Sequence, residues 1–307
     1  EEGNKIEIIK AASDNEEGRL IANSIFEIKN NESLKNTDFA VLYRTNAQSR
    51  SFEEALRRMG IPYRIYGGIS FYQRKEIKDF LAYLRFIVNT YDDEALKRII
   101  NYPARGIGKT TIEKVALYAN EKNIHMWEVL CNAAMFGFKS GALESIDNFV
   151  ITIKMFQSEL TKQNAYDLAV LVGKHSNIVK ELFNDKTTEG LARYENVQEL
   201  LNSIKEFIET PLNEEDGEVG DKGLGTYLQQ ISLLTDADAD SDENADTVKL
   251  MTIHAAKGLE FTMVFVAGLE ETLFPNAMSI NTREELEEER RLFYVAITRA
   301  KAKLVLS

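Results

Sequence analysis

The chain has 307 residues, of which 44% are hydrophobic and 28% are charged, and its formal net charge is −12. This length and apolar content exclude a disordered chain and leave room for two packed domains. The single cysteine, Cys131, excludes an internal disulfide, and neither an apolar run of about 18 residues nor a signal-like start is present. We therefore expect a globular protein of the reducing cytoplasm, without a membrane segment.

The acidic charge is unevenly distributed along the chain. Many Asp and Glu residues fall between Glu214 and Asp246, in a stretch rich in Gly and Asp that is typical of a solvated linker near residues 212–246. The net charge argues against a protein that coats nucleic acid nonspecifically, because such binding grows with the number of phosphates that Lys and Arg neutralise. The chain starts at Glu1 without a methionine, so we expect it to be a fragment of a longer protein.

The first part of the chain alternates strand and helix patterns. Residues 5–10 favour a short strand, and Ser13 with Glu16 three residues later forms a capping box for a helix through Phe26. The apolar run 39–43 is typical of a buried parallel strand. One helical face follows and stops at Gly60; it consists of Phe52, Ala55, Leu56 and Met59.

A helical block separates these elements from a second group of strands. Residues 61–66 favour a strand, and the helix after it has Ile77, Phe80, Leu81 and Leu84 on one face. Helical patterns continue through residue 209, and strand patterns return at 248–253, 263–267 and 303–306. This order predicts one α/β domain interrupted by a helical insertion. The expected parts are residues 1–92, 93–247 and 248–307.

Four sequence strings carry a resemblance to a known family. They are Tyr43 to Asn46 (YRTN), Gly67 to Ile77 (GGISFYQRKEI), Thr252 to Phe261 (TIHAAKGLEF) and Glu288 to Ala300 (EERRLFYVAITRA). Together they resemble the C-terminal region, domains 2A and 2B, of UvrD/PcrA/Rep-type superfamily 1 DNA helicases. The resemblance implies an α/β fold in which a RecA-like (P-loop NTPase-type) parallel-sheet domain is interrupted by a mostly helical inserted domain.

The resemblance also implies nucleotide contacts. Arg299 would be the catalytic arginine finger on the γ-phosphoryl group, a role that suits a permanently charged, planar guanidinium. Arg44 would meet the γ-phosphate, Tyr43 would stack on adenine, and Glu260 would reach the nucleotide sugar. The finger follows an amphipathic helix, for which we expect a capping box of Thr282 and Glu285 and inward Phe293 and Ile297.

DNA contacts are implied at three places. Thr252 and His254 would touch single-stranded DNA, as would Phe71 and Arg74, although Phe71 could equally be core packing. Residues 100–115 resemble a helix-hairpin-helix turn, whose glycines would let backbone amides approach a duplex phosphate. The alternative is an ordinary glycine turn between packed helices. The candidate contacts of this turn are Gly106, Gly108, Lys109, Thr110 and Thr111.

The glycine turn is not a P-loop, because G-x-x-x-x-G-K-T needs glycine at position 103, which is Pro103. This excludes an independent nucleotide kinase. No Asp-Glu pair of the Walker B kind follows an apolar strand, so nothing in the chain can cradle the β-phosphate or hold Mg²⁺. The resemblance places those parts, and the Mg²⁺ that accompanies ATP, on a preceding RecA-like domain. No His, Cys or carboxylate cluster has metal-ligand spacing, so we predict no metal bound by this chain.

The sequence therefore predicts the C-terminal motor half of an ATP-dependent 3'–5' DNA helicase, inactive alone. Its expected partners are single-stranded DNA, a duplex junction, the N-terminal half of the same polypeptide, and repair or replication proteins. One alternative is a noncatalytic DNA-binding or partner-docking module with the helicase shape. Another is the helicase part of a nuclease-linked repair enzyme.

Overall fold

The structure is a computed structural model that describes residues 4–210, 221–235, 245–276 and 282–307. Its contacts divide the chain into two compact units, one formed by Glu1–Arg74 with Asp236–Ser307 and the other by Lys75–Thr235. The sequence-based boundaries at 92/93 and 247/248 differ from these. Helix α3 (Lys75–Val88) belongs to the second unit because it packs against the helices of that unit.

The first unit is built on a six-stranded sheet in the order β1-β6-β5-β2-β4-β3, and its strand pairs are parallel. The register places Leu42 opposite Val266 and Tyr43 opposite Thr252. The strands are β1 (Glu7–Ile8), β2 (Phe39–Tyr43), β3 (Tyr63–Tyr66), β4 (Val248–Thr252), β5 (Phe261–Val266) and β6 (Ala300–Leu306). The predicted α/β class with a parallel sheet is confirmed.

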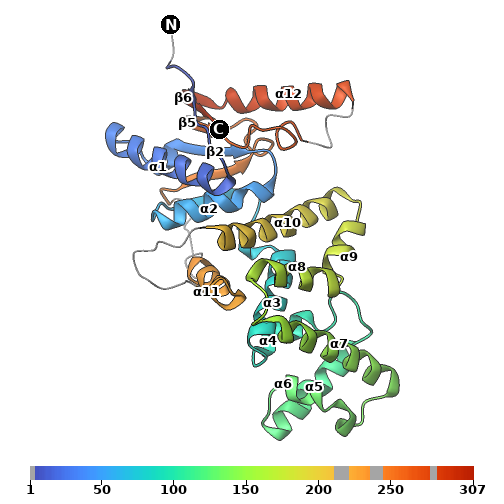
Figure 1. The fold of residues 1–307 in the computed structure, drawn as a ribbon. Coiled ribbons are helices and arrows are strands. Elements are labelled where there is room, and N and C mark those ends of the chain that lie inside the picture. The colour runs from blue at the N-terminus through green and yellow to red at the C-terminus, as the bar shows by residue number, and fades with distance from the viewer. Residues whose placement is uncertain (1–3, 211–220, 236–244, 277–281) are drawn as a thin grey trace. The chain divides into compact units, whose positions relative to one another are not determined.

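Helices cover both faces of this sheet (Figure 1). Helices α1 (Asp14–Glu32) and α2 (Ser49–Arg58) lie on one face, and α12 (Arg283–Ile297) lies on the other. Side chains alternate along β2, so Phe39, Val41 and Tyr43 join the core under α1 and α2. Ala40 and Leu42 join the core under α12. Burial on both faces explains why the strand is an unbroken apolar run.

The predicted helix starts are confirmed, with two adjustments. Glu16 N donates to Ser13 Oγ at 3.3 Å, and the helix continues past Phe26 to Glu32. Glu285 N donates to Thr282 Oγ1 at 3.2 Å at the start of α12. The inward face of α12 is carried by Leu292 and Ala296 rather than by Phe293 and Ile297, which are only half-buried.

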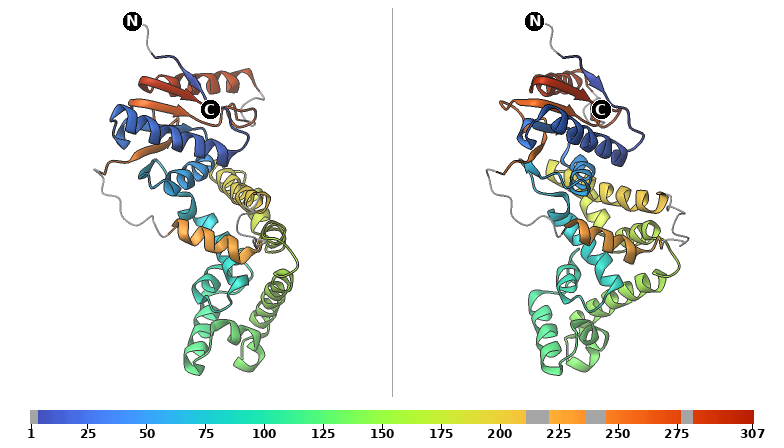
Figure 2. Two further views of the ribbon diagram at one scale, coloured as in Figure 1. Left: turned by 60° about the vertical axis from the view of Figure 1, so that its left-hand side comes forward. Right: turned by 90° about the vertical axis from the view of Figure 1, so that its left-hand side faces the viewer.

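The second unit is helical, and its described residues contain no strand (Figure 2). Besides α3, its α-helices are α4 (Asp93–Ile99), α5 (Lys109–Lys122), α6 (Met126–Cys131), α7 (Ser140–Glu159), α8 (Ala165–His175), α9 (Ile178–Asn184), α10 (Thr188–Glu209) and α11 (Leu224–Thr235). Short 3-10 turns lie at Asn36–Asp38, Asn46–Gln48 and Phe71–Gln73 in the first unit and at Ala133–Phe136 in the second.

Helix α11 falls within the segment predicted to be an acidic linker. Residues 211–220 and 236–244 of that segment lie outside the described residues. The part between them packs as a helix, with Leu224, Tyr227 and Ile231 buried and a 2.7 Å hydrogen bond between the hydroxyls of Ser203 and Tyr227. Because the segment is acidic in its average composition, the sequence pattern did not indicate this apolar face. Among the described helices, none has the length and apolarity needed to cross a membrane.

Candidate functional site

Two of the predicted nucleotide residues are neighbours at the edge of the sheet where the strands begin. Phe261 N donates to Arg299 O at 2.9 Å, so the starts of β5 and β6 lie together and Glu260 comes beside Arg299. Glu260 is exposed and Arg299 is half-buried. The Arg299 guanidinium donates from Nε to Val295 O, from Nη1 to Leu259 O and from Nη2 to Thr298 Oγ1, each at 3.0 Å.

These contacts hold the Arg299 guanidinium without using all of its donors. An arginine has five N–H groups, so the three hydrogen bonds within the described residues leave two for a ligand. The side chain follows the C-terminal end of α12, where the helix dipole favours a cation. A guanidinium held in this way suits a phosphate group, and the exposed Glu260 precedes the neighbouring strand.

A second arginine lies at the opposite edge, where the strands end. Arg44 follows β2, and its Nε and Nη2 donate to the Glu289 carboxylate of α12 at 2.7 to 3.1 Å. Glu289 is 3% exposed and also accepts from Asn276 N at 3.2 Å. Gln48 Oε1 accepts from the backbone N–H groups of Arg44 and Thr45, both at 2.9 Å. Glu289 thus holds the side chain of Arg44 and Gln48 holds the backbone of the loop after β2.

The loop after β4 lies beside that arginine. Ile253 N donates to Tyr43 O at 2.9 Å, and Thr252 Oγ1 accepts from Ala255 N at 3.3 Å. His254 is exposed at the surface of this loop. Partial burial of its ring, and then the nearby Arg44 guanidinium, lower the pKa of His254 below its ordinary value. The imidazole is therefore neutral near pH 7 and can both donate and accept a hydrogen bond.

Three loops meet at this strand-end edge. A Cβ on Gly67, after β3, would come within 3.2 Å of Ala255, after β4. A Cβ on Gly68 would come within 3.4 Å of Asn46 Oδ1, after β2. Open α/β sheets bind ligands outside the carboxyl ends of their strands. The strand-end edge is therefore a continuous candidate surface with Arg44, Asn46 and His254 on it.

The glycine turn of the second unit joins α4 to α5. Asn101 Oδ1 accepts from Arg105 N at 2.8 Å and from Ile107 N at 3.2 Å, and Ile107 is buried. Gly106 has φ +79°, a conformation that favours glycine. Gly108 precedes the first turn of α5, where backbone N–H groups lack intrahelical partners. Lys109 and Thr110 are exposed beside it, and Thr111 is half-buried.

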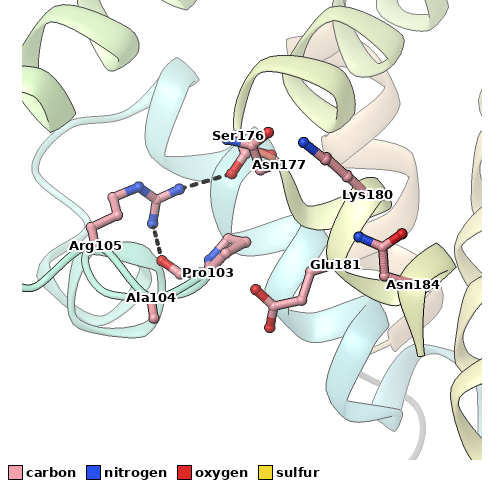
Figure 3. A pocket seen from close by; sticks show the side chains of 8 residues that line it. All are labelled: Pro103, Ala104, Arg105, Ser176, Asn177, Lys180, Glu181 and Asn184. Atoms are coloured by element: carbon pink, nitrogen blue, oxygen red, sulfur yellow. Dashed lines mark hydrogen bonds between the residues drawn. The ribbon is translucent and has the colours of Figure 1, made fainter.

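Arg105 stabilises this turn and lines a pocket of about 370 Å³ (Figure 3). Its guanidinium donates to Pro103 O at 2.9 Å and to Ser176 O at 3.1 Å, as the dashed lines in Figure 3 show. Further bonds reach Ile99 O at 3.1 Å and the Tyr83 hydroxyl at 2.5 Å. Arg105 therefore serves the fold of the turn, leaving the opposite, exposed side for a ligand.

Comparison with known proteins identifies the family of this chain. The model of the UvrD-like helicase C-terminal domain matches residues 1–307, the whole chain. This chain belongs to the UvrD-like helicase C-terminal domain family. The predicted family is confirmed. The sites above can therefore be compared with the roles that the sequence strings implied.

Curated relatives of the UvrD-like family are longer than this chain. The ATP-dependent DNA helicase PcrA of Staphylococcus aureus is 39% identical over 308 residues, covering 99% of this chain and 41% of the relative. PcrA of Bacillus subtilis is 38% identical over 312 residues, covering 100% and 41%. PcrA of Staphylococcus epidermidis is 38% identical over 311 residues, covering 99% and 41%. The chain thus spans about two fifths of their length.

The structure corrects the role expected of Tyr43. Its ring has 0% exposure and stacks on Phe52, with centroids 6.1 Å apart and planes at 8°. Burial raises the pKa of its hydroxyl far above the ordinary value. A ring enclosed between β2 and α2 has no face for an adenine, so Tyr43 is a core residue. The residue type suggested stacking, but alternation along β2 turned the ring inward.

Arg44 and Arg299 start from opposite edges of the sheet. Arg44 follows the end of β2, whereas Arg299 precedes the start of β6, and all strands between them are parallel. Strand β5 alone has six residues, which separates the two edges by about 20 Å. Both guanidinium groups contact α12, Arg44 at Glu289 and Arg299 at Val295. The contact of Arg44 with the γ-phosphate stays a prediction. Arg44 belongs to the edge that carries Thr252 and His254.

Phe71 and Arg74 are packing residues, which corrects their expected DNA contact. Phe71 has 0% exposure, so of the two readings of this residue the core one holds. Arg74 is 6% exposed and lies over the Phe71 ring, 5.1 Å from its centroid. Its Nη2 donates to Asn46 O at 2.9 Å and to Ser49 Oγ at 2.8 Å. Arg74 thereby supports the loop after β2 from beneath.

Sequence reasoning missed three residues that build the strand-end edge. Gln48 could have been found, because Thr45 with Gln48 three residues later has the spacing of a capping box. Glu289 stands inside the string from 288 to 300, but nothing local singles it out among its acidic neighbours. Glu53 is fully buried and accepts from Ser70 Oγ at 2.6 Å and from Phe71 N at 3.0 Å. Only the tertiary fold identifies these last two.

Proposed function

We propose that this chain is the C-terminal motor part of an ATP-dependent 3'–5' DNA helicase that moves along single-stranded DNA and unwinds duplexes in repair or replication. The observation that carries the proposal is the neighbouring pair of Arg299 and Glu260 at the strand-start edge. The names of the PcrA relatives support it. The cytoplasm is the compartment that we assign.

In this proposal the chain supplies one wall of a nucleotide site. Arg299 would direct its two remaining N–H groups at the transferring phosphoryl group, where a fixed cation stabilises the charge of the transition state. Glu260 would accept a hydrogen bond from a sugar hydroxyl. The chain has neither a Walker A nor a Walker B string. We therefore assign the β-phosphate cradle and the Mg²⁺ ligands to a RecA-like N-terminal half, and the chain alone is inactive.

The strand-end edge would hold single-stranded DNA. Thr252 and His254 are the contacts expected there. Arg44, whose side chain is oriented by Glu289, would meet the γ-phosphate. The turn from Gly106 to Thr111 would hold a duplex backbone, because it combines exposed donors with the start of a fourteen-residue helix. The two surfaces give the proposed partners, single-stranded DNA and a duplex junction, separate sites.

The arginine-finger role is tested by Arg299→Ala in the longer polypeptide that carries the N-terminal half. DNA-stimulated ATP hydrolysis should fall by about 10³-fold or more in kcat, with nucleotide affinity nearly unchanged. The reason is that the finger acts on charge that develops only in the transition state. The matched control is Arg291→Ala, on the preceding helix α12, whose side chain is 66% exposed and pairs with Glu288. The Arg291→Ala protein should hydrolyse ATP at the wild-type rate.

Near wild-type turnover of Arg299→Ala would overturn the finger role. It would favour the noncatalytic DNA-binding or docking module instead. Whether the longer protein also carries a nuclease is a separate property, measured by cleavage of labelled DNA.

A further inference from the structure

A pocket of about 450 Å³ lies between the loop after β5 and helix α12. The loop contributes Leu269, Phe274 and Pro275 to its lining, and α12 contributes Leu286 and Phe293. The rings of Phe274 and Phe293 meet edge to face, with centroids 6.0 Å apart. Ligand sites of proteins are concave, lined mostly by apolar and aromatic side chains, and of similar volume. This α12 pocket therefore has the size and the lining of a binding site.

Helix α12 presents apolar side chains to this pocket as well as to the sheet. Leu292 and Ala296 are buried in the core under the helix. The pocket is lined instead by Leu286, Arg290 and Phe293, which follow one another at positions i, i+4 and i+7 and so share a helical face. Leu286 is 47% exposed, and Phe293 is half-buried. The face therefore offers an apolar surface that a binding partner can cover.

Acidic side chains flank the α12 pocket in both of the segments that line it. Glu270 and Glu271 are exposed in the loop, directly after Leu269, and Glu284 is exposed in the first turn of α12. Within the described residues, no ion pair neutralises these three carboxylates. Arg283, at the start of α12, offsets one of the charges. A surplus of negative charge therefore remains around an apolar pocket.

The other cations near the pocket already have acidic partners. Arg290 Nε donates to Glu287 Oε2 at 2.9 Å, and Arg291 Nη1 donates to Glu288 Oε2 at 2.8 Å. A negative rim repels the phosphates of a nucleic acid, which bind where Lys and Arg neutralise them. It also disfavours a second copy of this chain, whose own net charge is −12. Lys and Arg side chains of a partner would be attracted.

We infer that the α12 pocket is a docking site for a basic amphipathic segment of a partner protein. A large apolar side chain of that segment would lie against Leu286 and Phe293, as an anchor does in a helix-in-groove complex. Its Lys or Arg side chains would lie near the carboxylates of the rim. The inference goes beyond the proposed function, because the pocket contains neither Arg299 nor Glu260.

The probe for this site is a fluorescein-labelled peptide of leucine and lysine, about two heptads long, with its leucines on one helical face. Fluorescence anisotropy measures its affinity for the longer polypeptide. The wild type should bind it, and Leu286→Gln should bind it about tenfold more weakly, because an uncharged polar side chain replaces part of the apolar surface. Glutamine is a good helix former, so α12 is retained. The matched control is Leu117→Gln on α5, an equally exposed leucine of the second unit, which should bind like the wild type.

Two further measurements separate the pocket from general attraction between opposite charges. A scrambled peptide of the same composition keeps the positive charge but has no apolar face, so the wild type should bind it about tenfold more weakly or less. The double variant Glu270→Gln/Glu271→Gln should bind the amphipathic peptide more weakly than the wild type. Its affinity should also depend less on salt, because exposed charges supply the screened part of the attraction.

Several results would overturn the inference. They are equal affinity for the amphipathic and scrambled peptides, full affinity in Leu286→Gln, and no binding by the wild type, which would mean that the pocket is covered within the longer polypeptide. A wild-type dimer in sedimentation that Leu286→Gln dissociates would assign the pocket to a second copy instead. Leu286→Gln should hydrolyse ATP at the wild-type rate, so a failure of the helicase proposal, seen as absent DNA-stimulated hydrolysis, is measured separately.

Discussion

The guanidinium of Arg299 donates to two carbonyl oxygens and one hydroxyl, whereas that of Arg44 donates to a buried carboxylate. Neutral acceptors leave the positive charge of Arg299 available to a phosphate. A carboxylate neutralises the charge of Arg44 and fixes its direction. The two arginines of the family strings thus have different surroundings, because their acceptors differ in charge.

A buried carboxylate offers a prediction at the same scale. Glu17 on α1 is 9% exposed and accepts from Gly268 N at 2.9 Å. Burial raises its pKa, outweighing the hydrogen bonds that lower it. The unfolded chain therefore releases this proton at a lower pH than the folded chain does. Between the unfolded and the raised folded pKa, the contribution of Glu17 to stability falls as the pH rises.

In Glu17→Gln this contribution to the pH dependence should disappear, because the amide keeps the acceptor for Gly268 N and cannot ionise. Urea unfolding followed between about pH 4 and pH 8 measures it, and the wild-type free energy of unfolding should decline with pH more steeply than that of the variant. Glu16→Gln is the matched control, since Glu16 is the preceding residue and its side chain is 39% exposed. Parallel curves for Glu17→Gln and the wild type would contradict the expectation.

At the scale of elements, the two helices on one face of the sheet approach each other through a glycine. A Cβ on Gly18 of α1 would stand 2.6 Å from Ser51 O of α2, a distance that a side chain cannot occupy without movement of the backbone. The close approach places α2 over the end of β2. There Phe52 joins the hydrophobic core, and Glu53 accepts a hydrogen bond from Phe71 N. The position of the loop after β2 therefore depends on this contact.

Gly18→Ala should lower the free energy of unfolding by about 1–3 kcal/mol, since added volume in a tight contact forces the helices apart. Chemical denaturation monitored by circular dichroism is the measurement. Gly141→Ala, in helix α7, serves as the control, because nothing lies within 4 Å of the added carbon. We expect it to cost nothing. A Gly18→Ala protein as stable as the wild type would mean that α1 and α2 are not in close contact.

The elements also differ in how well the sequence predicts them. The helix starts at Ser13 and Thr282 and the strand at 39–43 could be predicted, because capping and apolar runs are local properties of the chain. Helix α11 could not, since its apolar face lies inside a segment of acidic average composition. The buried role of Tyr43 was missed, and that of Phe71 was left open beside a DNA contact, for a related reason. A motif identifies a residue, but not the direction of its side chain.

For the whole molecule, the two units suggest two separate DNA contacts. The strand-end edge lies in the sheet unit, and the glycine turn lies in the helical unit. Lys109 has a side chain that is 88% exposed at the start of α5. Its charge would serve a duplex backbone and have no part in the contact with single-stranded DNA.

Lys109→Glu should therefore weaken binding to a duplex with a single-stranded tail while leaving affinity for single-stranded DNA unchanged. The slope of log affinity against log salt should fall by about 1. Fluorescence anisotropy with both DNAs over a range of salt concentrations provides the measurement. Lys122→Glu, exposed at the other end of the same helix, is the control. An equal loss of affinity for both DNAs would assign Lys109 to general electrostatics.

The sequence by itself determined the order of the strands, the parallel α/β class, the family and the residues Arg299, Glu260, Thr252 and His254 as candidates. These follow from contiguous strings, which encode local structure directly. Only the tertiary structure decided which edge each residue occupies and which side chains are enclosed. Arg44 meets Glu289 across 245 positions of the chain, and Glu260 lies beside Arg299 because β5 and β6 are parallel neighbours. Strand register and burial arise from packing between distant segments, which no local pattern contains.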